Sequence, residues 1–164
     1  MKQRKELIEV NDSLISGKGI FAKRPISKGI YLLKYTGEFI SKEKSAKELE
    51  NGNEYVFTLN DKHDIDGSVD WNITRFVNHS CSPNCEAINV DDEIWIASIK
   101  EINEGEELTF NYGYPLEEYK NNPCNCGSEN CLGYIVANED LEKLKQILES
   151  EQESLLLEAP SPSQ

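Results

Sequence analysis

The sequence has no long apolar run, and this absence excludes whole classes of protein. No stretch approaches the roughly 20 apolar residues that a membrane-spanning helix needs. The N-terminal segment MKQRKELIEVND carries charge but lacks the apolar core of a secretory signal. We therefore expect no membrane association and a cytoplasmic or nuclear location.

Positive charge is also scarce. The chain has 17 Lys and Arg against 30 Asp and Glu, which gives a formal net charge of -13. Proteins that bind a phosphate backbone need clustered Lys and Arg, so direct binding of nucleic acid is not expected. The acidity favours a cationic partner such as a Lys/Arg-rich tail. Solubility alone is the alternative explanation, and the net charge does not separate the two.

A glycine-rich dinucleotide loop and a long βαβ pattern are missing as well, which excludes a Rossmann-type fold. Short β-type runs instead alternate with Gly and Pro over residues 7–39. The sequence also predicts a helix over 42–51 capped by Ser41, and a hairpin that turns at Asp91-Asp92. At 164 residues the chain suits one domain, and we expect a mainly β fold of several small sheets with short helices.

The character of the sequence changes at residues 138–157, an acidic stretch with apolar residues at helical spacing. These apolar residues are Leu141, Leu144, Ile147, Leu148 and Leu155. The predicted amphipathic helix could pack on the domain, pair with a second copy to form a homo-oligomer, or bind a partner, and packing on the domain is the preferred interpretation. Residues 158–164 are expected to form a disordered tail.

The chain has five cysteines, and an odd number fits poorly with a closed set of disulfides. Cys124, Cys126 and Cys131 have the spacing C-x-C-x4-C, which is tight for a disulfide and suits a soft metal. A structural zinc ion needs four tetrahedral ligands, so one ligand must come from elsewhere. Cys81 and Cys85 both qualify. We prefer Cys81 because it adjoins other polar residues, although spacing alone does not decide.

Polar residues are concentrated in one short segment that contains Arg75, Asn78, His79 and Ser80. A buried Asn-His pair needs a partner for each donor and acceptor. A polar small-molecule ligand would supply these partners. A buried hydrogen-bond network between loops is the alternative interpretation.

Four aromatic residues also stand out: Tyr35, Phe110, Tyr112 and Tyr114. Aromatic residues in strands usually belong to the core. Beside a glycine turn they can instead line a narrow pocket whose ring faces attract a cation. A lysine ammonium and a sulfonium are cations that such a pocket would suit.

Together these segments resemble the SET-domain family of protein-lysine methyltransferases, with its cysteine-rich post-SET segment. The resemblance covers roughly residues 7–136, and the motifs occur in the order typical of the family. They are G-x-G followed by Ile20-Phe21, Tyr35-x-Gly37-Glu38, R-F-x-N-H-S-C-x-P-N from Arg75, E-L-T-F-x-Y from Glu107, and C-x-C-G-x3-C-x-G-Y-I from Cys124. The resemblance implies a SET domain over 5–115, a post-SET segment over 120–136, and a knot-like crossing of the segments that contain Asn78 and Tyr112.

The resemblance also implies roles for individual residues, with S-adenosylmethionine bound on one face and a substrate lysine entering a channel from the other. Tyr112 would be the catalytic tyrosine, with Tyr35 and Phe110 in the lysine channel. The cofactor would be contacted by Lys18 and Gly19 through their backbone, by Arg75 at its carboxylate, by Asn78 and His79 at its amino and adenine groups, and by Tyr134 packed on the adenine. The ligands of one structural Zn²⁺ would be Cys81, Cys124, Cys126 and Cys131.

The function implied by the resemblance is S-adenosylmethionine-dependent methylation of lysine in a histone or another Lys-rich basic protein. Phe110 occupies a position where the family has Phe or Tyr. A Tyr hydroxyl there would hold a water and favour monomethylation, so Phe implies di- or trimethylation. Asn111 departs from the Asp that is usual in the family. The alternative function is a non-catalytic, zinc-stapled interaction module, against which the presence of Arg75, Asn78, His79 and Tyr112 argues.

Overall fold

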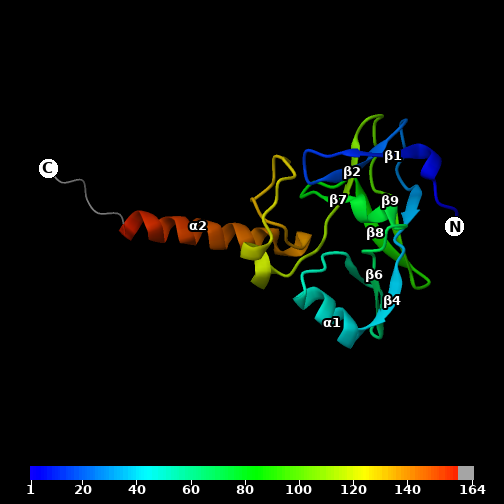
Figure 1. The fold of residues 1–164 in the computed structure, drawn as a ribbon. Coiled ribbons are helices and arrows are strands. Elements are labelled where there is room, and N and C mark those ends of the chain that lie inside the picture. Colours follow the sequence, from blue (N-terminus) through cyan, green and yellow to red (C-terminus); the bar gives the residue numbers. More distant parts are fainter. Residues whose placement is uncertain (159–164) are drawn as a thin grey trace.

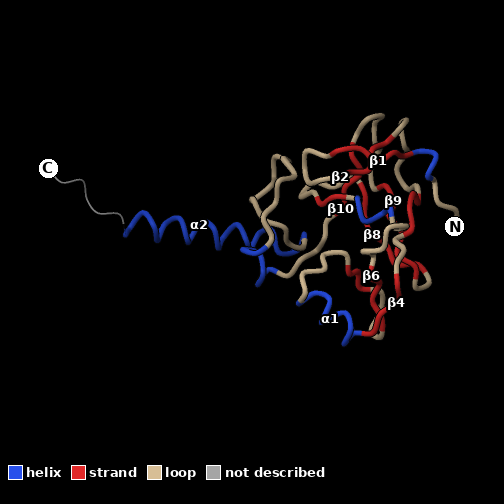
Figure 2. The backbone as a smooth tube through the Cα atoms, viewed as in Figure 1, coloured by secondary structure: helices blue, strands red, loops and turns tan. Residues whose placement is uncertain are grey.

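The structure, a computed structural model, describes residues 1–158, with the side chains of the last helix described as far as Ser154. Ten strands within this range form three small sheets, and the C-terminal helix projects away from them (Figure 1). The tube view shows short strands joined by loops, and a much longer C-terminal helix (Figure 2). The prediction of a mainly β fold with several small sheets is confirmed.

The first sheet brings the two ends of the domain together in the order β1-β2-β10-β7. Its strands are β1 (Ile8–Asp12), β2 (Lys18–Ala22), β7 (Asn78–His79) and β10 (Glu107–Phe110). Strand β7 lies parallel to β10, with Asn78 opposite Thr109 and His79 opposite Phe110. The predicted approach of the Asn78 segment to the segment leading into Tyr112 is therefore achieved by direct strand pairing.

The second sheet has the order β3-β9-β8 and forms much of the core. Its strands are β3 (Tyr31–Lys34), β8 (Cys85–Val90) and β9 (Glu93–Ser98). Asp91 and Asp92 have φ angles of 52° and 58°, the left-handed conformation that both central residues of a tight hairpin turn adopt. The predicted Asp91-Asp92 hairpin is confirmed. Strand β9 is buried from Ile94 to Ser98, so this sheet is covered on both faces.

The third sheet, in the order β4-β6-β5, carries the first helix on its side. Its elements are β4 (Glu38–Ser41), α1 (Lys42–Glu50), β5 (Val56–Thr58) and β6 (His63–Asp66). The Ser41 side chain accepts a hydrogen bond from the Lys44 backbone N–H, which is the predicted N-cap. Strand β5 is at the edge of this sheet, and the residues just before it reach the site described below.

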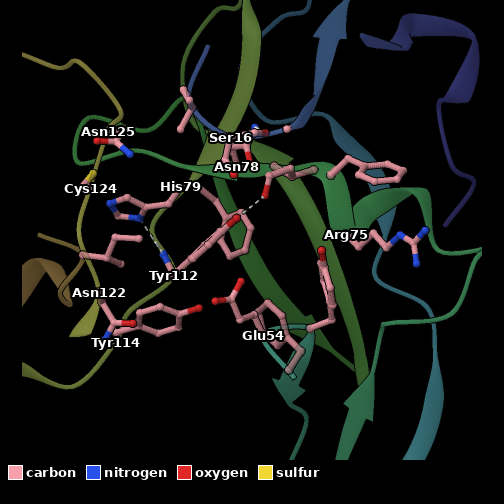
Figure 3. A pocket seen from close by; sticks show the side chains of 18 of the residues that line it. Ser16, Glu54, Arg75, Asn78, His79, Tyr112, Tyr114, Asn122, Cys124 and Asn125 are labelled. Carbon is pink, nitrogen blue, oxygen red and sulfur yellow. Dashed lines mark hydrogen bonds between the residues drawn. The ribbon is translucent and has the colours of Figure 1, made fainter. Parts of the chain in front are cut away.

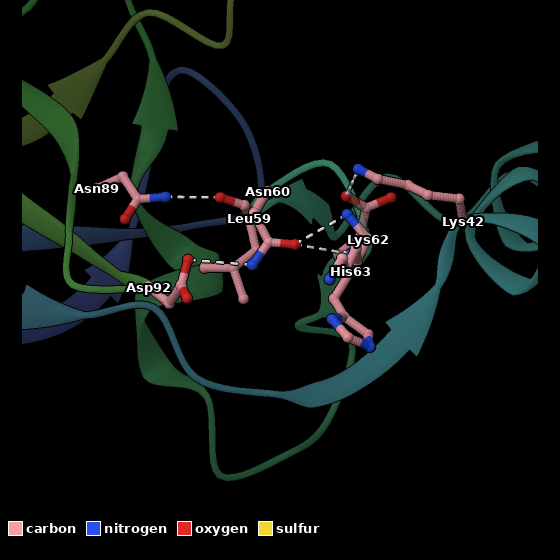
Figure 4. Close-up of polar contacts among 8 residues, drawn as sticks. Lys42, Leu59, Asn60, Lys62, His63, Asn89 and Asp92 are labelled. Carbon is pink, nitrogen blue, oxygen red and sulfur yellow. Dashed lines mark hydrogen bonds and ion pairs between the residues drawn. The ribbon is translucent and has the colours of Figure 1, made fainter.

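A polar network joins this third sheet to the β8–β9 hairpin (Figure 4). The Asn60 side chain donates to Asp92 at 3.0 Å and accepts from the backbone N–H of His63 at 2.9 Å. The Asn89 amide donates to the Leu59 carbonyl at 2.6 Å. These bonds satisfy the backbone of the β5–β6 turn and fix the edge strand relative to the core.

Three apolar clusters hold the fold together. The largest lies between the first two sheets and includes Ile20, Leu33, Ile96 and Leu108, all fully buried. The third cluster joins the cysteine segment (residues 120–136) to the C-terminal helix through Tyr119, Val136 and Leu144. Burial of so many aliphatic side chains is the main favourable contribution to folding.

The helix expected over 138–157 is observed as a 3₁₀ turn, Asn138–Asp140, followed by α2 (Leu141–Glu158). Leu144 is fully buried against the cysteine segment, so the first part of α2 packs on the domain as preferred. The disordered tail expected over 158–164 lies outside the described residues from residue 159 onward. Within the described range, no helix has the length and apolar character needed to span a bilayer.

Candidate active site and metal centre

One cavity of about 560 Å³ brings together residues from between Ile15 and Ile135. Its wall is formed by the loop between β1 and β2, by β7, by the segment after β10, by the residues before β5, and by the cysteine segment (Figure 3). One end is polar and contains Asn78. The other end is aromatic, and the two ends meet at Tyr112.

Asn78 organises the polar end. Its side-chain amide nitrogen lies 3.2 Å from the Ser16 carbonyl, 3.0 Å from the Lys18 carbonyl and 2.7 Å from a Glu107 carboxylate oxygen. The same carboxylate accepts hydrogen bonds from the Ser13 hydroxyl. The loop between β1 and β2 is therefore tied to β7 and β10 through Asn78 and Glu107.

His79 links the aromatic end to the cysteines. Its Nδ1 accepts the backbone N–H of Tyr112 at 3.2 Å, and its Nε2 lies 3.5 Å from the Cys81 sulfur. Burial lowers the pKa of His79 to about 4, so the ring is neutral at pH 7. Because Nδ1 is an acceptor, the single ring proton belongs on Nε2, where it is directed at the sulfur.

Five aromatic rings in successive contact form what we call the aromatic channel. They are Tyr35, Phe57, Phe110, Tyr112 and Tyr114. Ring centroids are 5.1 Å apart for Tyr35 and Phe57, and 6.1 Å apart for Phe57 and Phe110. They are 5.0 Å apart for Phe110 and Tyr112, and 5.7 Å for Tyr112 and Tyr114.

Two hydroxyl groups in the channel are held by backbone carbonyls. Tyr112 donates to the Val77 carbonyl at 3.2 Å, and Tyr35 donates to the Tyr55 carbonyl at 2.8 Å. Burial raises the pKa of both phenols well above their ordinary value. Both hydroxyls are therefore neutral hydrogen-bonding groups over the physiological pH range. Gly67 makes room for Tyr35, since a Cβ there would lie 2.3 Å from the Tyr35 hydroxyl oxygen.

The four cysteines expected to bind metal converge. The sulfur atoms of Cys81, Cys124, Cys126 and Cys131 all lie within 4.8 Å of one another. The Cys81 and Cys124 sulfurs are 3.8 Å apart, and a tetrahedron with zinc–sulfur bonds of about 2.3 Å has edges of about 3.8 Å. The donor set and its spacing fit a structural zinc ion, and Cys81, not Cys85, is the fourth member.

Hydrogen bonds to sulfur support this reading of the cluster. The Cys81 backbone N–H donates to the Cys126 sulfur at 3.4 Å, and Gly133 N–H lies 3.3 Å from the Cys131 sulfur. Although burial opposes ionisation, the Cys81 N–H and the neighbouring Ser128 lower the pKa of Cys126 to about 6. Cys85 is fully buried elsewhere, where burial raises its pKa to about 12, so it is an unreactive core thiol.

Two further residues predicted to bind the cofactor, Lys18 and Gly19, are the first residues of β2. The Lys18 backbone faces the cavity, while its ammonium pairs with Asp12 at 2.6 Å. Gly19 lies against Glu107, where a Cβ would approach a carboxylate oxygen to 2.3 Å. Its contribution is therefore to let Glu107 reach Asn78.

Arg75 and Tyr134 are not directed into the polar end. The Arg75 guanidinium donates to the Ser68 carbonyl at 2.6 Å and lies 3.3 Å from Asp70, and Figure 3 shows it pointing away from Asn78. Tyr134 packs edge-on against Tyr119 at 5.0 Å within the third apolar cluster. The neighbouring Ile135 lines the cavity.

Sequence reasoning missed several residues of the cavity wall. Phe57 lies in the middle of the aromatic channel, but the sequence around it indicates only an ordinary strand. Glu54 and Tyr55 line the cavity just before β5. Nothing in their spacing signals this position, because it depends on how the third sheet is placed against the first.

The convergence of the Asn78 segment, the Tyr112 segment and a four-cysteine cluster agrees with a comparison to known families. The SET-domain family matches residues 17–113, more than half of the chain. The chain belongs to the SET-domain family. The cysteine segment of this SET protein follows the matched region and corresponds to a post-SET segment.

Several proteins similar to this SET protein carry names that describe an activity. Human histone-lysine N-methyltransferase 2B is 35% identical over 144 residues, which covers 82% of this chain and 5% of the relative. Histone-lysine N-methyltransferase ATXR7 of Arabidopsis thaliana is 34% identical over 156 residues, covering 89% and 11%. The H3 lysine-4 specific enzyme of Schizosaccharomyces pombe is 37% identical over 145 residues, covering 82% and 16%. The matched segment thus spans only a small part of each of these relatives.

Proposed function

We propose that this SET protein is an S-adenosylmethionine-dependent protein-lysine N-methyltransferase. The observation that carries the proposal is the continuity of one cavity from a polar end, walled by Asn78 and the β1–β2 loop, into the aromatic channel, which it meets at Tyr112. A bulky polar cofactor and the thin apolar stem of a lysine need these two kinds of surface. The names of the relatives support the same activity.

The polar end has the groups that a cofactor with amino, carboxylate and adenine parts requires. Asn78 presents its side-chain oxygen after its nitrogen is engaged by the β1–β2 loop, and the post-SET residues 122–125 close the opposite wall. S-adenosylmethionine supplies an activated methyl group, so the protein has mainly to align the acceptor. The four cysteines would hold zinc and thereby keep the post-SET wall against the Asn78 segment.

The aromatic channel would prepare the lysine amine. Free lysine has a pKa of about 10.4 and is mostly protonated at neutral pH. Burial in this apolar channel, next to the sulfonium of the bound cofactor, disfavours the charged ammonium and so lowers the lysine pKa. The proton would leave to solvent at the channel mouth. Alignment of the neutral amine beside Tyr112 with a bound methyl donor would contribute several kcal/mol, up to about 7–11 in the best cases.

We infer that the substrate is a basic protein segment such as a histone tail. The net charge of -13 favours approach of a Lys/Arg-rich partner. The names of the relatives specify histone lysine, and one specifies H3 lysine-4. A cytoplasmic or nuclear location suits such a substrate.

We further propose that the product is di- or trimethyllysine. Phe110 is almost fully buried, stacks against Phe57, and offers the channel no hydroxyl group. A methylated amine is bulkier and less polar than a free amine, so an apolar wall accepts it at little cost.

The proposal is tested by incubating the purified protein with radiolabelled S-adenosylmethionine and core histones or basic peptides. Label should reach lysine with the wild type and fall by about 100-fold in Tyr112→Phe, since a small misplacement of a reactant costs about that much in an alignment-driven reaction. The matched control is Tyr31→Phe, because Tyr31 packs against Trp95, outside the cavity. Absence of both transfer and calorimetric cofactor binding in zinc-loaded protein would instead support the non-catalytic interaction module.

A further inference from the structure

Glu54 occupies the mouth of the aromatic channel. It lies two residues before the edge strand β5 and lines the cavity, while its side chain is exposed to solvent. Figure 3 shows its carboxylate directed toward the Tyr114 hydroxyl, on the side of the cavity opposite Asn78. A negative charge therefore stands where a ligand would enter the channel.

The Glu54 carboxylate has no protein partner among the described side chains. The acidic groups of the neighbouring β4–β6 region are engaged: Asp64 with Lys42, and Asp66 with Asn53 and the Ser68 backbone. Within the described residues, Glu54 itself forms no ion pair and no hydrogen bond with another side chain. Its charge is felt within the cavity, because it adds to burial in raising the pKa of Tyr114.

The depth of the channel determines what Glu54 would meet. The reacting amine belongs beside Tyr112, and Tyr114 is one ring farther out, with its centroid 5.7 Å from that of Tyr112. The four-carbon stem of a lysine would occupy this ring-lined passage. The neighbours of the lysine in the substrate chain would then lie at the mouth, at the level of Tyr114 and Glu54.

We propose that Glu54 is a specificity-determining residue that binds an arginine or lysine side chain adjacent to the target lysine. This inference rests on the proposed lysine methyltransferase function. The target ammonium itself is not the partner, because a carboxylate at contact distance would stabilise the protonated form that has to be lost. One ring farther out, the same charge stabilises the target ammonium less and can bind a second cation.

The test uses synthetic peptides that contain one lysine, with arginine, glutamine or glutamate placed in turn at the two positions on each side. For wild-type protein, KM should be about three- to fivefold lower with arginine than with glutamine at one of these positions, the size of effect that exposed ion pairs give. Glu54→Gln should abolish this preference, so that the arginine and glutamine peptides have the same KM. Glu54→Lys should reverse it in favour of glutamate.

Glu86→Gln is the matched control, because Glu86 is an exposed carboxylate on β8 that does not line the cavity. It should keep the wild-type preference. An arginine preference that persists in Glu54→Gln, or a wild type without any such preference, would overturn the inference.

Binding of the same peptides, measured by fluorescence anisotropy with S-adenosylhomocysteine present, separates this inference from the proposed function. Absence of transfer to any peptide or histone would count against the methyltransferase proposal. The arginine preference in binding, and its loss in Glu54→Gln, would still decide the role of Glu54.

Discussion

At the residue scale, Tyr112 is the point where the polar end of the cavity meets the aromatic channel. Its backbone N–H is held by His79, its hydroxyl by the Val77 carbonyl, and its ring by Phe110 and Tyr114. Three independent contacts thus fix one side chain. Such fixation is what an alignment-driven reaction needs, because small displacements are costly when geometry supplies the rate.

The raised pKa of Tyr112 predicts a particular pH dependence. Burial, together with Tyr114, raises the pKa of this phenol, so it stays protonated beyond pH 10. We expect kcat/KM to rise with pH as the substrate lysine loses its proton, without a decline up to pH 10. A pH–rate profile in buffers of constant ionic strength checks this, and a decline with a midpoint below pH 10 would contradict it.

The raised pKa values of Tyr35 and Tyr112 also affect the stability of the fold at high pH. In the unfolded chain, tyrosine ionises near its ordinary pKa of about 10. The folded state resists this ionisation at Tyr35 and Tyr112, so above that pH the unfolded state binds fewer protons than the folded state. The free energy of unfolding should therefore be constant with respect to these groups below pH 9 and fall as the pH rises through 10.

Another prediction at the residue scale concerns Phe110. Phe110→Tyr adds a hydroxyl group to a nearly buried ring that stacks on Phe57 and contacts Tyr112. Yield of trimethyllysine should fall by about tenfold or more relative to monomethyllysine, because a change of one group in an apolar pocket discriminates by roughly 10–200-fold. Mass spectrometry after exhaustive turnover measures this. A wild type that stops at +14 Da would contradict the assignment of Phe110.

At the element scale, the start of the C-terminal helix is attached to the site. Leu144 is fully buried against Tyr119 and Val136. Glu151 accepts hydrogen bonds from the Tyr119 hydroxyl at 3.2 Å and from Lys120 at 2.7 Å. Residues 121–125 form one wall of the cavity. Helix α2 packs against the residues on either side of this wall and so stabilises it.

Asn111 provides a further link, at a position where the family usually has Asp. Its amide nitrogen donates to the Asn138 side-chain oxygen at 2.7 Å, and its oxygen accepts the Gly113 N–H at 2.6 Å. The segment between β10 and Tyr114 is thus tied to the turn that precedes α2. The departure from the family pattern replaces a carboxylate with a group that donates and accepts at once.

Leu144→Ala should lower the free energy of unfolding by about 2–5 kcal/mol, the usual cost of truncating a buried leucine. Cofactor affinity should fall with it, because the supported wall loosens. Lys145→Ala, an exposed change on the same helix, is the control and should alter neither quantity. Urea denaturation and calorimetry give the two measurements, and an unchanged unfolding free energy in Leu144→Ala would contradict the packing described.

Elements were predicted from the sequence where the cause of their formation is local. The helix α1 with its Ser41 cap and the Asp91-Asp92 hairpin depend on neighbours in sequence and were expected. The sequence predicts a cluster of four cysteines but does not decide between Cys81 and Cys85 as the fourth. Only the fold decides between them. The positions of Phe57 and Glu54 in the cavity wall, and the packing of Tyr134 on Tyr119, depend on how separate elements are placed, and no local pattern encodes that placement.

At the scale of the whole molecule, the cysteine cluster joins the middle of the chain to the post-SET segment. Removal of zinc by a strong chelator should abolish methyl transfer and lower cofactor affinity by at least about tenfold. Elemental analysis should find about one zinc per chain in the wild type and in Cys85→Ala, and little in Cys131→Ser. Cys85→Ala without zinc, or Cys131→Ser with full zinc, would contradict the ligand set.

The pairing of β2 and β7 with β10 has a consequence for how the protein is made. During synthesis β1 and β2, which pair with each other, leave the ribosome long before Glu107, the partner of Phe21 on β2, has been added. Three of the four sulfurs and one wall of the cavity follow later still. A nascent chain therefore completes the site late, first when β10 is added and finally when the cysteine segment follows. Ribosome-stalled chains that end before Cys131 should accordingly be protease-sensitive around residues 78–81, while chains that extend past α2 should resist cleavage there.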